Sequence, residues 1–407
     1  MTGTGDGRAV RSIAQKISAL PGGRHAVVAW LFLGLVGVLT GCGITSAPTA
    51  TPAVDRPSVV SPSYAVQVFL WWRPTEEIRR DLALVKDLGF GWAKQGFAWR
   101  DIEDIKKGAF NWYFPDVIVE EAERAGLQLL VRIDRQPFWS QAEGASLYLN
   151  GPPKDLADLA DFCRILAARY RGRISAYQVW NEPNLSREWG ENPPDPAGYV
   201  ELLRVCYQAI KESDPDAIVI SAGLAPTGVR STEAMPDDEY LDAMYAAGAA
   251  PYLDMLGVNA PGYKAPPEVG PDEAADPSAG WGGHRTFVFR HVEDLRAIMV
   301  AHGDSDKQVA ILELGWTTDP RPDSAYHWHS VTEEQQADYL VRAYQYAAAN
   351  WPWVGLINAV YIAHPEWTPD NEEYWWALTY PGFPEVNVRP AYDALRAMRK
   401  ESTSPTR

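Results

Sequence analysis

The sequence predicts an α/β fold, a (β/α)₈ TIM barrel in a single domain. From residue 64 onward, eight short β-rich runs alternate with amphipathic helical runs. The β-rich runs are mostly continuously apolar, which is typical of parallel strands buried on both faces. A doubly wound open sheet is the main alternative. No glycine-rich phosphate loop follows the first strand, so the barrel is favoured.

Each element can be placed from its local pattern. Gly89, Gly126 and Gly172 stand where helix C′ residues belong. The helical patterns include 75–89, 114–126, 155–172 and 333–350. The expected strands are 64–72, 90–95, 127–134, 174–180, 217–223, 252–259, 308–315 and 356–363.

Composition limits the classes of function. The 407 residues, 46% of them hydrophobic and 12% aromatic, are enough for one large core. A formal net charge of −16 argues against nucleic acid or anionic lipid headgroups as partners. The 17 tryptophans are more informative, because indole faces stack well on the C–H faces of sugars, although many must belong to the core.

The N-terminal segment has the pattern of an export signal. Basic residues within 1–24 precede an apolar run over 26–41, which is short for a bilayer span. The run ends in Leu39-Thr40-Gly41-Cys42, which resembles the lipobox of bacterial lipoproteins. The resemblance implies a signal peptide over 1–41, lipidation of Cys42 and an extracytoplasmic, membrane-anchored protein at the bacterial cell surface or envelope. An uncleaved N-terminal helix is the alternative anchor.

The remaining chain divides simply. Residues 42–63 are rich in Pro, Ser and Thr and predict an extended tether, 64–400 form the barrel domain, and 401–407 are a tail. The stretch 260–286 reads as an elaborated loop after the sixth strand. Cys163 and Cys206 lie on apolar helix stripes and are expected to be buried thiols; whether they pair stays open.

Two carboxylates follow expected strands. Glu182 lies in "AYQVWNEPNLS", directly after the fourth strand, and Glu313 lies in "VAILELGWTT", at the end of the seventh. In a (β/α)₈ barrel the chemistry sits at the carboxyl ends of the strands, where strands four and seven can face each other. Two carboxylates flanking one bond are what glycoside hydrolysis requires.

Trp180-Asn181-Glu182-Pro183 resembles the Asn-Glu-Pro signature of clan A retaining glycoside hydrolases, the cellulase and β-xylosidase-like (β/α)₈ superfamily. The resemblance implies that Glu182 is the acid/base, Glu313 the nucleophile and 64–400 one catalytic domain. It also implies an oligo- or polysaccharide substrate, no cofactor and no metal. The retaining mechanism predicts carboxyl groups about 5–5.5 Å apart.

Further candidates follow from the same resemblance. Asn181 is placed to donate to a sugar 2-hydroxyl, and Lys94 stands where the clan usually has an arginine that supports the nucleophile. Trp99 follows in the same segment as a substrate-binding candidate. After the sixth strand the clan has His-x-Tyr, but this chain has Asn259 and then Tyr263, displaced by two positions. Tyr263 is the candidate to contact the nucleophile.

Aromatic and histidine residues near strand ends complete the candidates. Trp139, Trp316 and Trp375, the last beside Trp376, are possible sugar platforms, with plain core packing as the alternative. His327 and His329 have the spacing of a metal pair but no evident third ligand, so ordinary loop histidines are favoured.

The alternatives to a hydrolase use the same barrel. One is a non-catalytic surface protein that binds carbohydrate through an aromatic cleft, and another is a transglycosylase that uses both carboxylates. The departures at Lys94 and Asn259 keep the first alternative open. Sugar identity, linkage, endo or exo action and oligomeric state are left open by the sequence.

Overall fold

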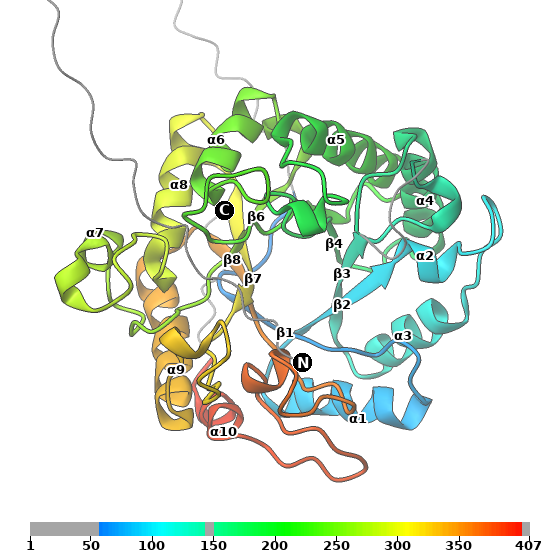
Figure 1. Ribbon diagram of the computed structural model, residues 1–407. Helices are drawn as coiled ribbons and strands as arrows, with labels where there is room; N and C mark the ends of the chain where they lie inside the picture. Colours follow the sequence, from blue (N-terminus) through cyan, green and yellow to red (C-terminus); the bar gives the residue numbers. More distant parts are fainter. Residues whose placement is uncertain (1–56, 143–149, 401–407) are drawn as a thin grey trace, which may run out of the picture. The chain divides into compact units, whose positions relative to one another are not determined.

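The computed structural model describes residues 57–142 and 150–400. In this part of the chain, eight parallel strands close into a barrel in sequence order, with β8 pairing β1 (Figure 1). The predicted fold class is confirmed. The strands are β1 (Ser63–Gln67), β2 (Trp92–Ala98), β3 (Gln128–Asp134), β4 (Ala176–Val179), β5 (Ile218–Ile220), β6 (Met255–Asn259), β7 (Gln308–Leu314) and β8 (Val354–Ala359).

Helices surround this barrel (Figure 1). They run antiparallel to the strands, so each of the main helices begins on the face where the preceding strand ends. No helix among the described residues is both long and apolar enough to cross a membrane. The helices are α1 (Thr75–Asp87), α2 (Trp99–Ile102), α3 (Tyr113–Arg124), α4 (Leu156–Arg169), α5 (Pro196–Ser213), α6 (Asp237–Ala246), α7 (Pro271–Ala275), α8 (Val292–Ala301), α9 (Glu333–Asn350) and α10 (Pro390–Ala397).

Glycines end three of the helices, as the sequence predicts. Gly89, Gly126 and Gly172 follow α1, α3 and α4 with φ of +74°, +66° and +71°. These values lie in the left-handed region, where a residue without Cβ has no steric penalty.

The strands are buried on both faces. Inward-facing side chains such as Trp92, Leu130 and Leu312 fill the barrel, while outward-facing ones pack beneath the helices. This double burial explains the continuous apolar runs. Cys163 of α4 and Cys206 of α5 are buried, as expected, and both are free. Burial together with a hydrogen bond from the Cys206 thiol to Cys163 raises the pKa of Cys206.

The base of the barrel is closed by residues that precede the expected domain boundary. Val59 is 8% exposed, and its N–H and C=O each bond the side-chain amide of Gln308 at 3.0 Å. The expected tether over 42–63 therefore overlaps the folded domain. Its proline-rich composition hides these contacts, because they depend on a side chain of β7.

Several strands end earlier than expected. The first ends at Gln67 instead of residue 72, and the fifth at Ile220 instead of residue 223. Beyond Ile220 the backbone leaves the ladder, and the carbonyl of Gly223 accepts a hydrogen bond from Glu182 N–H at 3.1 Å. Stretch 260–286 is a long loop with a short α7, as expected.

Candidate active site

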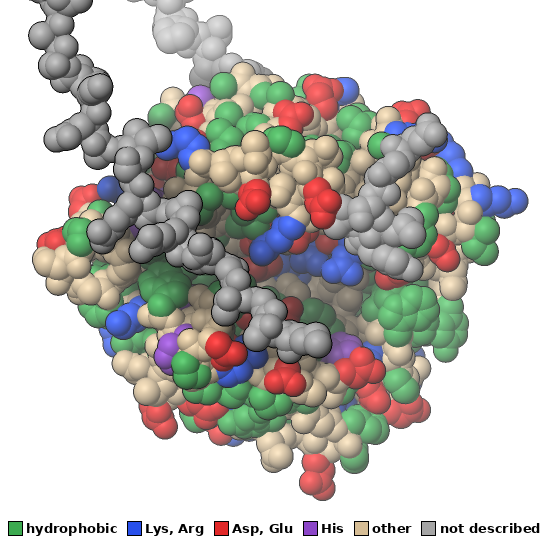
Figure 2. Space-filling view, viewed as in Figure 1, with side chains coloured by type: hydrophobic (Ala, Val, Ile, Leu, Met, Phe, Trp, Pro, Cys, Tyr) green, Lys and Arg blue, Asp and Glu red, His purple; other side chains and the backbone are tan. Residues whose placement is uncertain are grey.

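A cavity of about 640 Å³ opens at the carboxyl ends of the strands. Glu182 after β4 and Glu313 in β7 both line it, together with Gln67 at the end of β1 and Asn259 at the end of β6. In Figure 2 the surface is hollowed over the barrel, and acidic and basic side chains lie beside one another there. The structure therefore brings the two predicted catalytic carboxylates into one cavity.

The segment after β4 turns sharply to present Glu182. Trp180 and Glu182 have φ of +73° and +40°, which is uncommon for residues with a side chain. The amide of Asn184 holds the turn, because it donates to the carbonyls of Ala225 and Met235 at 2.9 and 3.0 Å. An Asn-Glu-Pro-Asn sequence thus supplies both the Glu182 carboxylate and the residue that fixes its loop.

Both carboxylate oxygens of Glu182 accept hydrogen bonds. Asn259 Nδ2 lies 3.0 Å from Oε1, and Arg187 Nη2 lies 3.3 Å from Oε2. Burial and the charge of Glu313 raise the pKa of Glu182 to about 7, against the opposing effect of Arg187. A carboxyl group in this state is protonated in a large fraction of molecules near neutral pH, as a general acid requires.

Glu313 is paired with the cation expected to support it. Lys94 Nζ lies 3.8 Å from Glu313 Oε1 and donates to the carbonyl of Leu312 at 3.0 Å. Burial lowers the pKa of Lys94 to about 8, although Glu313 opposes this shift. The support is a single long ion pair rather than the bidentate contact that an arginine makes.

Asn181 is oriented by a residue that sequence reasoning missed. Arg132 Nη1 donates to Asn181 Oδ1 at 3.3 Å, and Arg132 Nε pairs with Asp134 at 2.8 Å. Because Oδ1 is engaged, the amide of Asn181 keeps its NH₂ group for a ligand. The signal was an arginine inside the apolar strand "QLLVRID", since a charge buried in a barrel strand needs a reason to be there.

The strand-six residues act differently from the clan pattern. Asn259, where the clan has His, donates to Glu182. The Tyr263 hydroxyl donates to the carbonyl of Pro226 at 2.9 Å, so the expected bond from Tyr263 to Glu313 is not made. Tyr263 still lines the cavity. Tyr361, which follows β8, also lines the cavity, and burial together with the charge of Glu313 raises its pKa.

The prediction of substrate contact is wrong for two of the tryptophans. Trp99 and Trp316 are 0% exposed, with their indole N–H groups bonded to Glu103 and to the Ala265 carbonyl. Trp316 packs so closely on Gly262 that a Cβ there would lie 1.8 Å from Cε2 of the ring. Both rings are core.

The other two predicted indoles lie outside the cavity. Trp139 donates to the carbonyl of Glu103 at 2.7 Å, and Trp375 donates to that of Pro369 at 3.0 Å. The aromatic lining comes instead from loop residues. Those lining residues are Phe69, Tyr263, Tyr326, Tyr361, Trp367 and Trp376.

The two histidines of the HxH pair have different surroundings. His329 is buried in the cavity wall, and burial lowers its pKa to about 4, so its ring is neutral near pH 7. His327 is exposed. Within the described residues, no three or more His, Cys, Asp or Glu side chains are grouped to hold a metal ion.

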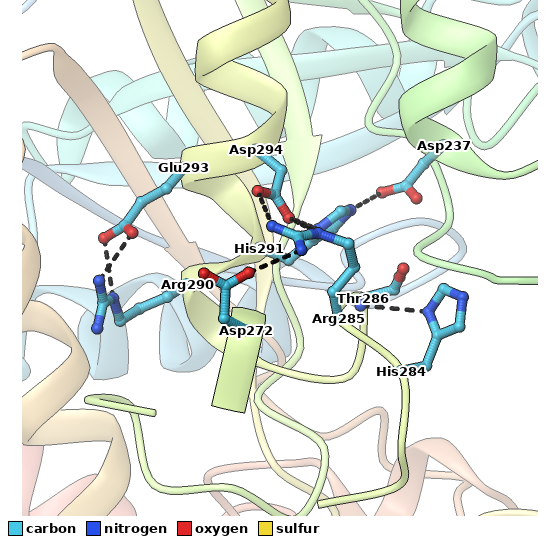
Figure 3. A network of polar contacts seen from close by, with 9 residues as sticks. All are labelled: Asp237, Asp272, His284, Arg285, Thr286, Arg290, His291, Glu293 and Asp294. Atoms are coloured by element: carbon cyan, nitrogen blue, oxygen red, sulfur yellow. Dashed lines mark hydrogen bonds and ion pairs between the residues drawn. The ribbon is translucent and has the colours of Figure 1, made fainter. Parts of the chain in front are cut away.

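A charged network ties together the loops that follow β5 and β6 (Figure 3). His291 Nε2 contacts Asp237 at the start of α6, and Nδ1 contacts Asp294 of α8, each at 3.0 Å. Arg285 extends the network from Asp294 at 2.7 Å to Asp272 at 2.9 Å.

The charges of this network are mutually stabilised. Burial opposes ionisation of His291, but Asp237 and Asp294 outweigh it and raise the pKa of His291 to about 9. Burial also opposes ionisation of Asp294, whereas hydrogen bonds from His291 and Arg285 lower its pKa to about 2. The network links the segments that follow β5 and β6, and these segments also carry Pro226 and Tyr263, two residues of the cavity wall.

No protein-family model matches the chain, and no curated protein matches it either. Solved structures do. A family 39 glycoside hydrolase from Bacteroides cellulosilyticus WH2 is 18% identical with a TM-score of 0.60, over 84% of this chain and 63% of that chain. The GH39 enzyme from Xanthomonas axonopodis pv. citri is 17% identical with a TM-score of 0.58, over 84% and 67%.

GH5_18 from Streptomyces cattleya, solved in complex with GlcNAc, is 17% identical with a TM-score of 0.58, over 86% of this chain and 83% of that chain. This chain spans less than two thirds of the family 39 enzyme from Bacteroides, at 63% of its length. At these identities the likeness establishes a shared (β/α)₈ fold.

Proposed function

We propose that the protein is a retaining glycoside hydrolase with Glu182 as acid/base and Glu313 as nucleophile. The observation that supports this most is the shared cavity of the two carboxylates. Within it, burial and the charge of Glu313 raise the pKa of Glu182 to about 7, while the Lys94 ammonium lies beside Glu313. Two carboxyl groups with such different surroundings suit the roles of acid and nucleophile.

The reaction follows two displacements. Glu313 attacks the anomeric carbon while Glu182 gives its proton to the departing glycosidic oxygen, which leaves a glycosyl–Glu313 ester and a free alcohol. Glu182, now ionised, takes a proton from water, and the water oxygen displaces Glu313. Asn181, held by Arg132, is oriented to donate to the sugar 2-hydroxyl.

We infer that the substrate is an oligo- or polysaccharide. The cavity combines carboxylates and arginines with aromatic walls that include Phe69, Trp367 and Trp376. Flat aromatic faces and a few convergent polar groups suit a sugar ring, which has C–H faces and a hydroxyl rim. The structural neighbours named above are glycoside hydrolases, which agrees with this inference.

Turnover of 4-nitrophenyl glycosides of several configurations tests the proposal. Glu182→Gln and Glu313→Gln are expected to lose about 10²–10⁴-fold in kcat. Glu373→Gln removes a carboxylate of the same cavity that the mechanism does not use, and serves as the matched control. NMR of the first-formed product should show retained anomeric configuration.

Other outcomes of this experiment separate the alternatives. Unchanged turnover in both glutamine variants contradicts the assignment. Saccharide binding by the wild-type protein without turnover of any glycoside indicates a carbohydrate-binding protein. Transfer of sugar to added alcohol acceptors in place of water indicates a transglycosylase.

We also propose that the chain is anchored to a bacterial membrane on its extracytoplasmic side. The signal-like segment 1–41 and Cys42 lie outside the described residues, so the support is the sequence pattern alone. Mass spectrometry of the mature N-terminus should find a lipid-modified Cys42. An unmodified Met1 contradicts the lipoprotein form of this proposal.

A further inference from the structure

Two strongly exposed aromatic side chains lie on the same face as the cavity. Trp72 is 62% exposed and Tyr113 is 64% exposed, more than any other aromatic residue among those described. Trp72 lies shortly before α1, and Tyr113 is the first residue of α3. Because helices of this barrel begin where the strands end, both residues lie at the catalytic face.

The two rings belong to one surface cluster. Trp72 and Tyr113 each meet Phe114 edge-on, with centroid separations of 4.9 and 5.0 Å. Trp71 joins the cluster to Phe97 of β2 at 5.4 Å. In Figure 2, hydrophobic side chains gather beside the hollow, on the side where α3 lies in Figure 1. The cluster is thus fixed to the barrel while two of its rings face solvent.

The backbone at Trp72 is unfavourable for its side chain. Its φ of +62° lies in the left-handed region, where bulky residues are uncommon. Two features of Trp72 are therefore unfavourable. Its large apolar ring is exposed to water, and its backbone adopts a conformation that residues with a side chain disfavour. Such outliers persist mainly where they serve a function.

A residue of the cavity wall, Phe69, lies close to the cluster along the chain. Phe69 lines the cavity and packs edge-on against Trp367, another lining residue, at 4.8 Å. Trp72 follows Phe69 by three residues, so their Cα atoms are at most about 11 Å apart. A short oligosaccharide spans that distance.

We propose that Trp72 and Tyr113 form a platform that binds sugar units beyond the reaction centre. The substrate is then a polysaccharide or long oligosaccharide instead of a small glycoside. This inference rests on the proposed hydrolase function and refines its substrate class. The occupant is a sugar chain, because exposed Trp and Tyr faces next to a polar cleft match alternating C–H faces and hydroxyl groups.

Kinetics on two kinds of substrate test the platform. The polymers are soluble xylan, mixed-linkage β-glucan and galactomannan, and the small substrates are 4-nitrophenyl glycosides. For the polymer that is hydrolysed, Trp72→Ala combined with Tyr113→Ala should raise KM about tenfold. The kcat/KM on the 4-nitrophenyl glycoside should stay within about twofold. Trp72→Phe should restore most of the affinity.

Phe383→Ala is the matched control, because Phe383 is another exposed aromatic, 48% exposed, and it packs on Arg80 of α1. It should change neither parameter. Equal changes on polymer and small glycoside, or no change on either, overturn the platform.

Affinity electrophoresis in native gels containing the same polymers separates this inference from the hydrolase assignment. Retardation of the wild-type protein that the double variant loses supports the platform even where no substrate is turned over. No retardation of the wild-type protein in any gel overturns it. A concentration-dependent dimer abolished by the same substitutions also overturns it, because the patch is then a contact between two copies of the chain.

Discussion

The guanidinium of Arg187 contacts the carboxylate of Glu182, with 3.3 Å between Nη2 and Oε2. Arg187 stabilises the ionised form of Glu182 and so opposes the rise of its pKa. Its side chain is 67% exposed, which limits the strength of this ion pair. Arg187 lines the same cavity as Glu182.

Arg187→Ala should shift the alkaline limb of the pH profile of kcat/KM to higher pH. Without the cation, the pKa of Glu182 rises, so its protonated form persists to higher pH. An exposed ion pair is worth at most about 1 kcal/mol, so the rate at pH 6 should change by less than about fivefold. Arg187→Lys retains the charge and is the control. A shift to lower pH contradicts the account.

Glu313→Gln should lower the pKa of Glu182 below its value of about 7. The negative charge of Glu313 is one cause of the raised pKa, and burial is the larger one that remains. NMR titration of the protein with ¹³C-labelled glutamate side chains measures the change. Glu373→Gln serves as the control for substitution of another carboxylate in the cavity. An unchanged pKa in Glu313→Gln means that the two groups do not interact.

Lys94→Met should reduce kcat by roughly 10²-fold, because it removes the cation 3.8 Å from Glu313, the proposed nucleophile. KM for a small glycoside should change little. Thermal unfolding of the variant checks the fold, because Lys94 is buried and also bonds the carbonyl of Leu312. Full activity in a folded Lys94→Met protein excludes a supporting role.

Gly223→Ala should reduce kcat by about 10²-fold through displacement of Asn259. A Cβ at Gly223 would lie 2.1 Å from Asn259 Oδ1, and Asn259 holds Glu182 at 3.0 Å. Gly91→Ala is the matched control, because a Cβ there meets no atom within 4 Å. Steady-state kinetics of both variants measure the effect, and equal activity refutes the positioning role.

His291→Ala should lower the free energy of unfolding by about 3–5 kcal/mol at pH 6, because it leaves buried Asp237 without its cation. His302→Ala is the control. His302 pairs with Asp242 at 2.8 Å, but both side chains are partly exposed, so the loss should stay near 1 kcal/mol or less. Urea unfolding measures both values.

The same histidine predicts a pH dependence of stability. Its pKa is raised from 6.5 to about 9 in the folded protein, so the folded state binds the proton more tightly. This contribution is fully present below pH 6.5 and is lost as the pH rises through about 9. The difference in unfolding free energy between wild type and His291→Ala should therefore shrink between pH 6 and 10. A constant difference contradicts the charged network.

The fold and the two carboxylates were accessible from the sequence because their signals are local. Apolar runs buried on both faces predicted the strands, and Asn181-Glu182-Pro183 marked the end of β4. The environments of the tryptophan rings could not be predicted from the sequence. The local sequence around Trp316 is compatible with a ring that faces a cleft and with a ring packed in the core. The course of the loop after β6 determines that the ring packs on Gly262.

Two further failures have similar causes. Arg132 was not among the candidates, because its partner Asn181 follows a different strand, β4. The tether boundary near residue 63 was set by composition, whereas Val59 is held by Gln308 of β7, which is distant in the sequence. Contacts of this kind depend on the closed barrel and leave no local pattern.

Labelling with activated 2-deoxy-2-fluoro glycosides of several configurations, followed by peptide mass mapping, tests the central assignment most directly. The account predicts a single covalent adduct on Glu313, with matching loss of activity and slow reactivation in buffer. An adduct on Glu182 or on another carboxylate of the cavity, in a protein that turns over the parent glycoside, would contradict it.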